Sequence, residues 1–239
     1  MTDNHIMQSL WIGDRLSTME RLCIRSFLAN GHEFHLYLYG SCDGVPEGAT
    51  VKNANEIIPQ EDIRKYPSLP NFSDIFRYPL LQQRAAWWVD LDVVCLKPFD
   101  FTDDYVFASE EFPPGCLLVN GCILKAPPDG DLLKVAIERC NQQDSLHPKG
   151  KYFDGGLAFG PELMTNLTEE LGLRSYVRPR SVFTPISCQR VPQDFIDPLP
   201  KADMSSAYAC HLFHSQWFDA LEKTHPMTSL YEQMKRKFL

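Results

Sequence analysis

The chain has 239 residues, of which 44% are hydrophobic and 23% are charged. That balance is typical of a globular protein with a sizeable buried core and argues against a disordered chain. The formal net charge is −8 at pH 7, so the overall charge gives no reason to expect binding to nucleic acid or to an anionic membrane. No run of about 18 apolar residues is present, and no membrane-spanning helix is expected.

The N-terminus and the cysteines bear on the compartment of the protein. Residues 1–5 carry no cationic stretch followed by an apolar one, so we expect no secretory signal and a cytoplasmic location. The eight cysteines form no CxxC pair, which argues against a zinc ribbon and against a thioredoxin-like site. Several lie in apolar runs, such as Cys95, and these are expected to be buried, reduced thiols.

The first segments alternate between strand-like and helix-like patterns. Residues 9–13 predict a strand that ends at a glycine turn, and residues 17–20 have the spacing of a helix capping box. A helix is expected from there to Asn30, with Gly31 as its stop. Residues 32–39 then alternate apolar and polar side chains with the two-residue period of a strand. This β-α-β opening indicates an α/β fold.

A second helix and strand are expected before the middle of the chain. Ser73 is expected to cap a helix that runs to about Ala86, and Pro79 is expected to bend it. The helix leads directly into a strand over residues 87–95, which are almost entirely apolar apart from two aspartates.

The second half of the chain is less regular. A strand is expected over residues 116–125, a helix over residues 131–143, and another helix from Pro161 to about Gly172. Residues 178–200 contain five prolines, too many for regular structure, so we expect a long loop that serves binding. No internal repeat or linker divides the sequence. A single domain over residues 1–239 is therefore the simplest organisation.

The most informative segment is Asp90-Leu91-Asp92. Two carboxylates at positions i and i+2 of a straight strand point to one face, and burying both charges without a counter-ion is costly. Carboxylate oxygens suit Mg²⁺ or Mn²⁺, and either ion usually shares its coordination shell with substrate phosphates. The alternative is a strand end at which both carboxylates only bind loop amides, because a bare DxD pattern is short and unspecific.

Two other sets of residues are candidates for the same site. Asp74 and Arg77 lie three residues apart on a predicted helix, hence on one face, either as part of a site or as a surface ion pair. His211 and His214 lie close to Trp217. Either imidazole could complete a metal shell begun by two aspartates, whereas a buried structural histidine is the alternative.

Together these residues carry a family resemblance. Residues 71–78 contain serine and aspartate followed by arginine, and residues 87–98 contain an aromatic-x-Asp-x-Asp sequence followed by Leu-Lys-Pro. This order resembles the DXD block of the Och1-like and capsular-polysaccharide-synthesis glycosyltransferases. Shorter segments are similar to other motifs of that family: residues 10–13, 22–27, 160–161 and 211–217.

The resemblance implies a GT-A fold, a Rossmann-like α/β sandwich with a mostly parallel central sheet. It also implies transfer of a hexose from a nucleotide-sugar with retention of the anomeric configuration. Asp90 and Asp92 would then hold Mn²⁺ or Mg²⁺ and the donor diphosphate. His211 would be the third metal-site residue, with His214 as the alternative.

The resemblance places the donor in the first part of the chain. Asp74 and Arg77 would contact hydroxyl groups of the donor sugar and ribose. The backbone of Trp11, Ile12 and Gly13 would hold the base, and Asn120 would lie near the donor. Residues 1–100 would form the half that binds the nucleotide-sugar, and residues 101–239 would form the acceptor side.

The chemistry and partners follow the same resemblance. Retention of the anomeric configuration can be achieved in two ways. Either the acceptor hydroxyl attacks the sugar on the face that the diphosphate leaves, or a carboxylate of the protein attacks the sugar first. Asp154, followed by Gly155-Gly156, is the candidate nucleophile, although an aspartate that caps a glycine turn explains the sequence equally well. A UDP-sugar is the expected donor. The expected acceptor is a saccharide or glycolipid of surface polysaccharide or capsule assembly.

The C-terminal residues 227–239 combine an apolar pattern with Lys235, Arg236 and Lys237. Basic residues in a last helical turn complement the helix dipole. The alternative is a helix that docks peripherally on the membrane where lipid-linked acceptors reside.

Two other classes of function compete with a glycosyltransferase. A haloacid-dehalogenase-type phosphohydrolase also places DxD after an apolar strand, but normally near the N-terminus. A non-catalytic carbohydrate-binding protein could retain the fold, yet the complete set of Asp90, Asp92 and a histidine argues against it.

Overall fold

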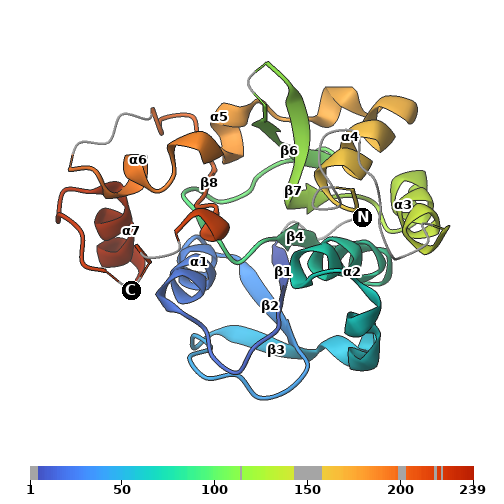
Figure 1. Cartoon of the computed structure of the whole chain (residues 1–239), viewed down its shortest axis with the longest axis horizontal. Coiled ribbons are helices and arrows are strands. Elements are labelled where there is room, and N and C mark those ends of the chain that lie inside the picture. Colours follow the sequence, from blue (N-terminus) through green and yellow to red (C-terminus); the bar gives the residue numbers. More distant parts are fainter. Residues whose placement is uncertain (1–4, 114, 143–157, 199–202, 218–219, 222) are drawn as a thin grey trace.

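The computed structural model describes residues 5–113, 115–142, 158–198, 203–217, 220–221 and 223–239 (Figure 1). Its helices and strands, in chain order, are β1 (Ile6–Trp11), α1 (Thr18–Ala29), β2 (Glu33–Leu38), β3 (Ala49–Asn53), α2 (Leu69–Gln83), β4 (Trp87–Val89), β5 (Val93–Cys95), β6 (Val106–Glu111), β7 (Leu117–Lys125), α3 (Asp131–Gln142), α4 (Pro161–Glu170), α5 (Arg180–Phe183), α6 (Gln193–Ile196), β8 (Ala209–His211) and α7 (Leu230–Phe238). Short 3₁₀ turns lie between several of them.

A six-stranded sheet with the order β3-β2-β1-β4-β7-β6 forms the centre of the molecule. β3, β2, β1 and β4 pair in parallel, whereas β7 runs antiparallel to both β4 and β6. The sheet is therefore mostly parallel. The α/β fold with a mostly parallel central sheet is confirmed.

Helices cover both faces of this sheet (Figure 1). On one face α2, α3 and α4 pack over a core that includes Trp88. On the other face α1 packs over a core that includes Trp87 and Val89. Successive side chains of a strand point to opposite faces, and both faces are covered, so β4 consists of apolar residues only.

The opening β-α-β unit is confirmed. Ser17 caps α1, and a capping box joins it to Glu20, whose Oε2 accepts a hydrogen bond from Ser17 N at 2.6 Å. The helix ends at Asn30, and Gly31 follows with φ +83°, a left-handed conformation that glycine adopts without strain. β1 begins at Ile6, earlier than predicted.

Two predictions about the second helix and strand are wrong. α2 is capped by Ser68 and not by Ser73, which lies inside the helix. Pro70 in the first turn needs no backbone N–H there, which explains the earlier start. The strand predicted over residues 87–95 is interrupted at residues 90–92, and β5 pairs with β8 in a separate two-stranded sheet.

The later elements are confirmed in part. β7, α3 and α4 lie close to their predicted bounds, and Pro161 occupies the first turn of α4. β6 was not predicted, because its second half, Ser109 to Glu111, is polar. The described part of residues 178–200 contains the short helices α5 and α6 between its prolines. All eight cysteines are free thiols, and five of them are buried.

The C-terminal helix α7 packs its apolar face into the protein. Tyr231, Met234 and Phe238 are buried in a cluster shared with α1 and α6. Lys235 pairs with Glu232 at 2.6 Å. Most of the apolar pattern suggested for membrane docking is thus covered by protein, although Met227 is 54% exposed. The helix-dipole interpretation fits the basic last turn. None of the described helices has the length and apolar character needed to cross a membrane.

Candidate functional site

The strand order places a site between β1 and β4. From β1 the chain continues to β2 and β3 on one side, whereas β4 borders β7 and β6 on the other. In open α/β sheets, ligands bind outside the carboxyl ends of the strands at such a switch point. Trp11 ends β1 and Asp90 directly follows β4, so both lie at this edge.

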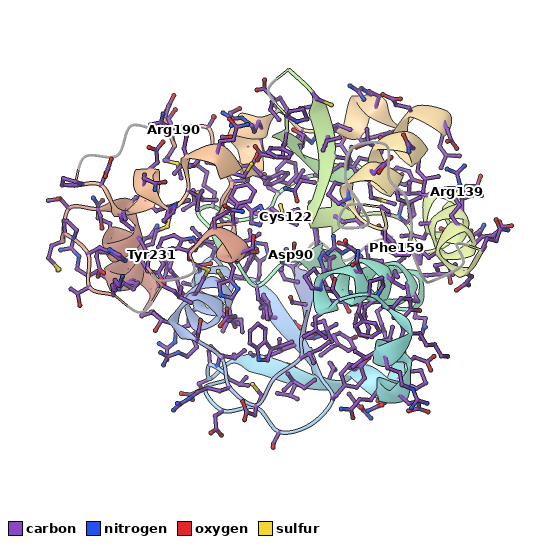
Figure 2. All side chains as sticks on the ribbon, in the orientation of Figure 1. Asp90, Cys122, Arg139, Phe159, Arg190 and Tyr231 are labelled. Atoms are coloured by element: carbon purple, nitrogen blue, oxygen red, sulfur yellow. The ribbon has the colours of Figure 1, made fainter. Side chains whose placement is uncertain are left out.

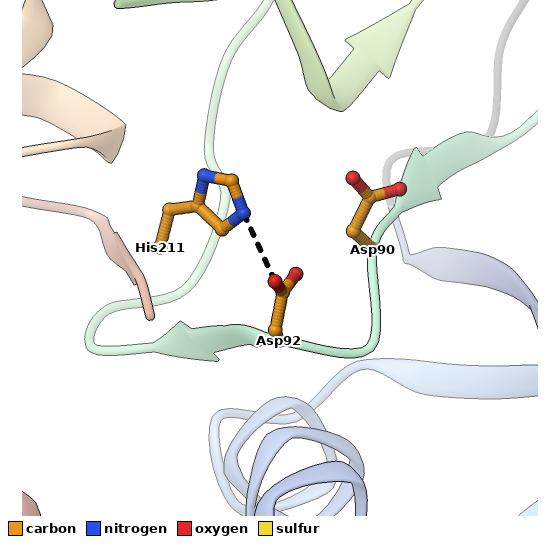
Figure 3. Close-up of side chains that lie close together, drawn as sticks. All are labelled: Asp90, Asp92 and His211. Atoms are coloured by element: carbon orange, nitrogen blue, oxygen red, sulfur yellow. Dashed lines mark hydrogen bonds and ion pairs between the residues drawn. The ribbon is translucent and has the colours of Figure 1, made fainter. Parts of the chain in front are cut away.

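Residues 90–92 form a turn that carries the chain from the large sheet to the small one. Asp90 N still donates to Cys122 O of β7 at 2.8 Å, near the centre of the molecule (Figure 2). Val93 N donates to Asp90 O at 3.2 Å and closes the turn. Leu91 is buried in the core. Asp90 and Asp92 therefore share one side because of this turn and not because a straight strand continues (Figure 3).

The small sheet brings His211 to the turn. In the antiparallel pairing of β5 with β8, His211 lies opposite Val93. Leu212 N donates to Asp92 O at 2.7 Å, and His211 Nε2 lies 3.2 Å from Asp92 Oδ2 (Figure 3). A histidine that is distant in the sequence is thus held by backbone pairing against the second aspartate.

The segment after β8 is anchored by Trp217. This side chain is 1% exposed, and its Nε1 donates to Leu212 O at 2.7 Å. Phe213 has a φ of 54°, which is uncommon for a bulky residue, and its ring centroid lies 3.9 Å from that of His211. The histidine-to-tryptophan motif therefore combines a candidate site residue, His211, with Trp217, the side chain that anchors the segment after β8.

Asp90, Asp92 and His211 form a group that fits a divalent cation. One ligand atom from each, two carboxylate oxygens and a ring nitrogen, lie within 4.8 Å of one another. Hard oxygens with one imidazole suit Mn²⁺ or Mg²⁺. His214 contributes differently, because its backbone N–H donates to Asp92 Oδ2 at 2.9 Å and its ring is not part of the group.

The charges in this group partly balance one another. Burial raises the pKa of Asp90, although Arg77 opposes the rise. Burial also tends to raise the pKa of Asp92. The charge and hydrogen bond of His211 have a larger, opposite effect and lower this pKa to about 2. Burial alone would lower the pKa of His211, and the Asp92 charge raises it well above its ordinary value. A cation is the natural counter-charge for the two carboxylates.

Arg77 connects Asp74 to Asp90. Its Nη2 lies 2.8 Å from Asp74 Oδ1 and 3.4 Å from Asp90 Oδ1. The guanidinium stacks over Trp88, 5.0 Å from the ring centroid, and Trp88 Nε1 donates to Asp90 Oδ1 at 2.7 Å. Since the Arg77 side chain is 4% exposed and that of Asp74 12%, the surface ion pair is the wrong interpretation. Burial raises the pKa of Asp74 to about 6 against the opposing charge of Arg77.

Two glycines make room for this buried pair. A Cβ atom on Gly121 would lie 1.8 Å from Arg77 Nη1, and one on Gly160 would lie 2.4 Å from Asp74 Oδ2. Gly160 was predicted only as part of a family motif, and the role of Gly121 was not predicted from the sequence. The available signal was an isolated glycine in the predicted strand 116–125, which marks a close approach by another group.

Two cavities meet at these residues and share Pro70, Asp74, Arg77 and Asp90. The first, here called the β1 cavity, has a volume of about 410 Å³ and is also lined by Trp11, Ile12, Ser73, Asp92 and His214. The second, here called the β7 cavity, has a volume of about 550 Å³ and is also lined by Glu110, Phe112, Leu118, Asn120, His211 and Phe213.

The remaining predicted site residues are distributed as follows. Trp11 and Ile12 face the β1 cavity, whereas Gly13 is exposed and does not line it. Asn120 lines the β7 cavity, and its Oδ1 accepts a hydrogen bond from Cys122 N at 2.9 Å. Asp154 lies outside the described residues.

Comparison with known proteins gives structural likenesses only. No protein-family model matches the sequence, and neither does any curated protein. The apo form of the glycosyltransferase GlyE from Streptococcus pneumoniae TIGR4 has a TM-score of 0.54 at 9% identity, and the match covers 97% of this chain. This chain spans 60% of GlyE. At that identity the likeness shows a shared fold and nothing more.

Two further solved structures are glycosyltransferases. The enzyme involved in glycosylation of the major capsid of PBCV-1 has a TM-score of 0.49 at 13% identity, with 96% of this chain and 98% of that chain covered. The PaToxG glycosyltransferase has a TM-score of 0.46 at 16% identity, with 72% and 71% covered.

Proposed function

We propose that the protein is a metal-dependent glycosyltransferase that moves a hexose from a nucleotide-sugar to a saccharide acceptor. The observation that carries this proposal is the group Asp90, Asp92 and His211 at the carboxyl end of β4, between two cavities. Its position at the switch point of a mostly parallel sheet is where such folds bind nucleotides. The fold shared with GlyE supports the same class of reaction.

In this proposal each residue of the candidate site has a defined task in the reaction. A bound cation would offset the negative charge that develops on the leaving diphosphate. Asp90, Asp92 and His211 would hold that cation, and Trp88 and Arg77 keep the Asp90 carboxylate oriented. Arg77 Nε has no partner among the described residues, so it retains a donor for a donor-sugar hydroxyl or a phosphate.

The finer assignments belong to the same proposal. The donor is a UDP-sugar, the metal is Mn²⁺ or Mg²⁺, the configuration is retained, and the acceptor is a saccharide or glycolipid of surface polysaccharide assembly. The resemblance of residues 71–78 and 87–98 to the DXD block supports these choices. Trp11 and Ile12 at the β1 cavity suit a nucleoside base, since an aromatic face stacks on it. The anomeric proton coupling of the product, read by NMR, tests retention.

The test of the proposed function is ligand-induced stabilisation of the purified protein. Thermal unfolding is followed with UDP, GDP and their hexose conjugates, each with Mn²⁺, with Mg²⁺ or with EDTA. A ligand at a hundred times its Kd stabilises by about 2.7 kcal/mol, which gives a clear rise in Tm. We expect UDP and a UDP-sugar to raise Tm only with metal, together with slow release of UDP from the sugar.

Asp92→Asn should abolish the metal-dependent rise and the slow donor hydrolysis. Asp104→Asn removes the same charge from an exposed position and should leave both unchanged. Absence of binding by every nucleotide-sugar, combined with cleavage of p-nitrophenyl phosphate, would refute the proposal in favour of a phosphohydrolase.

A further inference from the structure

Glu110 is a buried carboxylate that the site described above does not use. It lies opposite Leu118 near the end of β6 and is 5% exposed. Neither carboxylate oxygen has a hydrogen-bond partner among the described residues. Burying a carboxylate without hydrogen-bond donors costs free energy, and native proteins rarely contain a buried carboxylate that lacks such donors. A ligand that brings a donor would explain why this group is kept.

The surroundings compensate the Glu110 charge only in part. Arg180 Nη1 on α5 lies 4.0 Å from Glu110 Oε1, at the outer limit of an ion pair. Burial raises the pKa of Glu110, and the charges of Arg180 and His211 and the nearby amides of Glu111 and Cys188 oppose the rise without cancelling it. These groups favour a carboxylate there, yet no described side chain lies within hydrogen-bond distance of either oxygen.

The β7 cavity indicates what kind of ligand brings the donor. Apolar side chains form much of its wall: Pro70, Phe112, Leu118, Pro161 and Phe213. Glu110 is a polar group on this wall whose oxygens have no hydrogen-bond partner among the described residues. Aromatic and apolar walls with a few unpaired polar groups suit a saccharide, whose C–H faces pack on rings while its hydroxyl groups find fixed partners.

We propose that Glu110 accepts a hydrogen bond from a hydroxyl group of the saccharide acceptor, bound in the β7 cavity. The inference rests on the proposed function and adds to it the side chain that binds the acceptor. Among the residues that the two cavities do not share, Trp11 and Ile12 line the β1 cavity and Glu110 lines the β7 cavity. A donor base in the β1 cavity therefore leaves the β7 cavity to the acceptor.

The chain segment around Glu110 agrees with that assignment. Cys188, from the proline-rich residues 178–200, lines the same cavity, and Thr184 Oγ1 donates to Ser109 O at 2.6 Å, which ties α5 to β6. The segment that was expected to serve binding thus reaches the wall that carries Glu110.

The test measures binding of two probes to the intact protein. One is Mn²⁺ with UDP, and the other is a panel of p-nitrophenyl α- and β-D-hexopyranosides added to the protein with Mn²⁺ and UDP present. In Glu110→Ala, the Kd for the hexoside that binds the wild type should rise about tenfold to a hundredfold, the usual effect of losing a hydrogen bond to a charged group. Glu110→Gln keeps the shape and one acceptor oxygen, so its Kd should rise less, about threefold or more. The Kd for Mn²⁺ and UDP should stay within about twofold.

Two control variants separate binding from a structural role. Glu111→Gln changes the neighbouring carboxylate, which is exposed, and should leave both Kd values unchanged. Arg180→Gln breaks the ion pair but keeps Glu110. If Glu110 served only to hold α5, Glu110→Gln and Arg180→Gln would lower Tm alike and leave the hexoside Kd untouched, which would overturn the proposal.

Other outcomes are equally decisive. Weaker binding of Mn²⁺ and UDP by Glu110→Gln would place this residue on the donor side and overturn the acceptor assignment. A wild type that binds Mn²⁺ and UDP but none of the hexosides would also overturn it. Failure of the wild type to bind any nucleotide with metal is a different result, because it contradicts the proposed function itself.

Discussion

Asp92 and His211 are 119 residues apart in the chain, yet His211 Nε2 lies 3.2 Å from Asp92 Oδ2. The contact is produced by the two-stranded sheet, in which β8 pairs with β5 immediately after the turn that carries Asp92. Because backbone hydrogen bonds set this register, the relative position of the two side chains does not depend on a flexible loop. The small sheet is therefore the element that assembles the candidate metal site.

His211→Ala and His214→Ala should differ sharply in metal affinity. His211 offers a ring nitrogen to the group, whereas His214 offers its backbone N–H to Asp92, which alanine retains. We expect His211→Ala to weaken Mn²⁺ binding by about tenfold or more, since even residues that only orient a ligand cost that much when lost. Electron paramagnetic resonance of free Mn²⁺ measures the affinity. Equal losses in both variants would mean that the His214 ring also binds the metal.

The sequence predicted the content of the site better than its geometry. Asp90, Asp92 and His211 were identified by residue type and family resemblance, and the structure brings them together. The turn at Leu91 was not predicted, because an apolar residue between two aspartates is equally compatible with a continued strand. The burial of Leu91 in the folded protein and the pairing of β5 with β8 are what distinguish a turn from a continued strand.

Glu110 and Gly121 were missed for a related reason. Both lie in strands at the β7 cavity, and their importance depends on neighbours that are distant in sequence. Gly121 matters because the side chain of Arg77 passes over it, and Glu110 because its oxygens have no hydrogen-bond partner among the described residues. Periodicity and propensity describe one segment at a time and carry no information about such contacts.

Gly121→Ala should disable the site without unfolding the protein. The added Cβ would lie 1.8 Å from Arg77 Nη1, so the guanidinium must leave the position in which it pairs with Asp74 and Asp90. Since displacements of about 1 Å can cost about a hundredfold in rate, we expect a comparable loss of kcat/KM for donor hydrolysis. Gly40→Ala is the matched control, because a Cβ atom there has no neighbour within 4 Å. Unchanged turnover in Gly121→Ala would show that Arg77 has no part in the reaction.

The start of α2 gives a prediction about stability. Asn71 N donates to Ser68 Oγ at 3.3 Å, the contact that caps the helix, whereas Ser73 lies within the helix. Loss of an N-cap side chain costs about 1 kcal/mol. Urea unfolding should therefore show Ser68→Ala less stable by about that amount, and Ser73→Ala within about 0.5 kcal/mol of the wild type. The reverse order would move the helix start to the position that the sequence suggested.

The pKa of Asp74 predicts how stability changes with pH. Burial raises this pKa to about 6 in the folded protein, above the value of about 3.9 for an unfolded chain. Between those two values the folded state binds more protons than the unfolded state, so stability falls as pH rises through that window. The favourable contribution of Asp74 to the free energy of unfolding is complete below about pH 4 and lost above about pH 6. Its size is about 3 kcal/mol, from 1.36 kcal/mol per pKa unit.

Asp74→Asn removes this dependence, because the amide is neutral at every pH. Urea unfolding in EDTA at intervals from pH 4 to pH 7 should show the variant gaining stability relative to the wild type as pH rises, with most of the change complete by about pH 6.5. Asp104→Asn, at an exposed position, should follow the wild-type curve. If Asp74→Asn also followed it, Asp74 would be ionised throughout this range, and its pairing with Arg77 would outweigh the cost of burial.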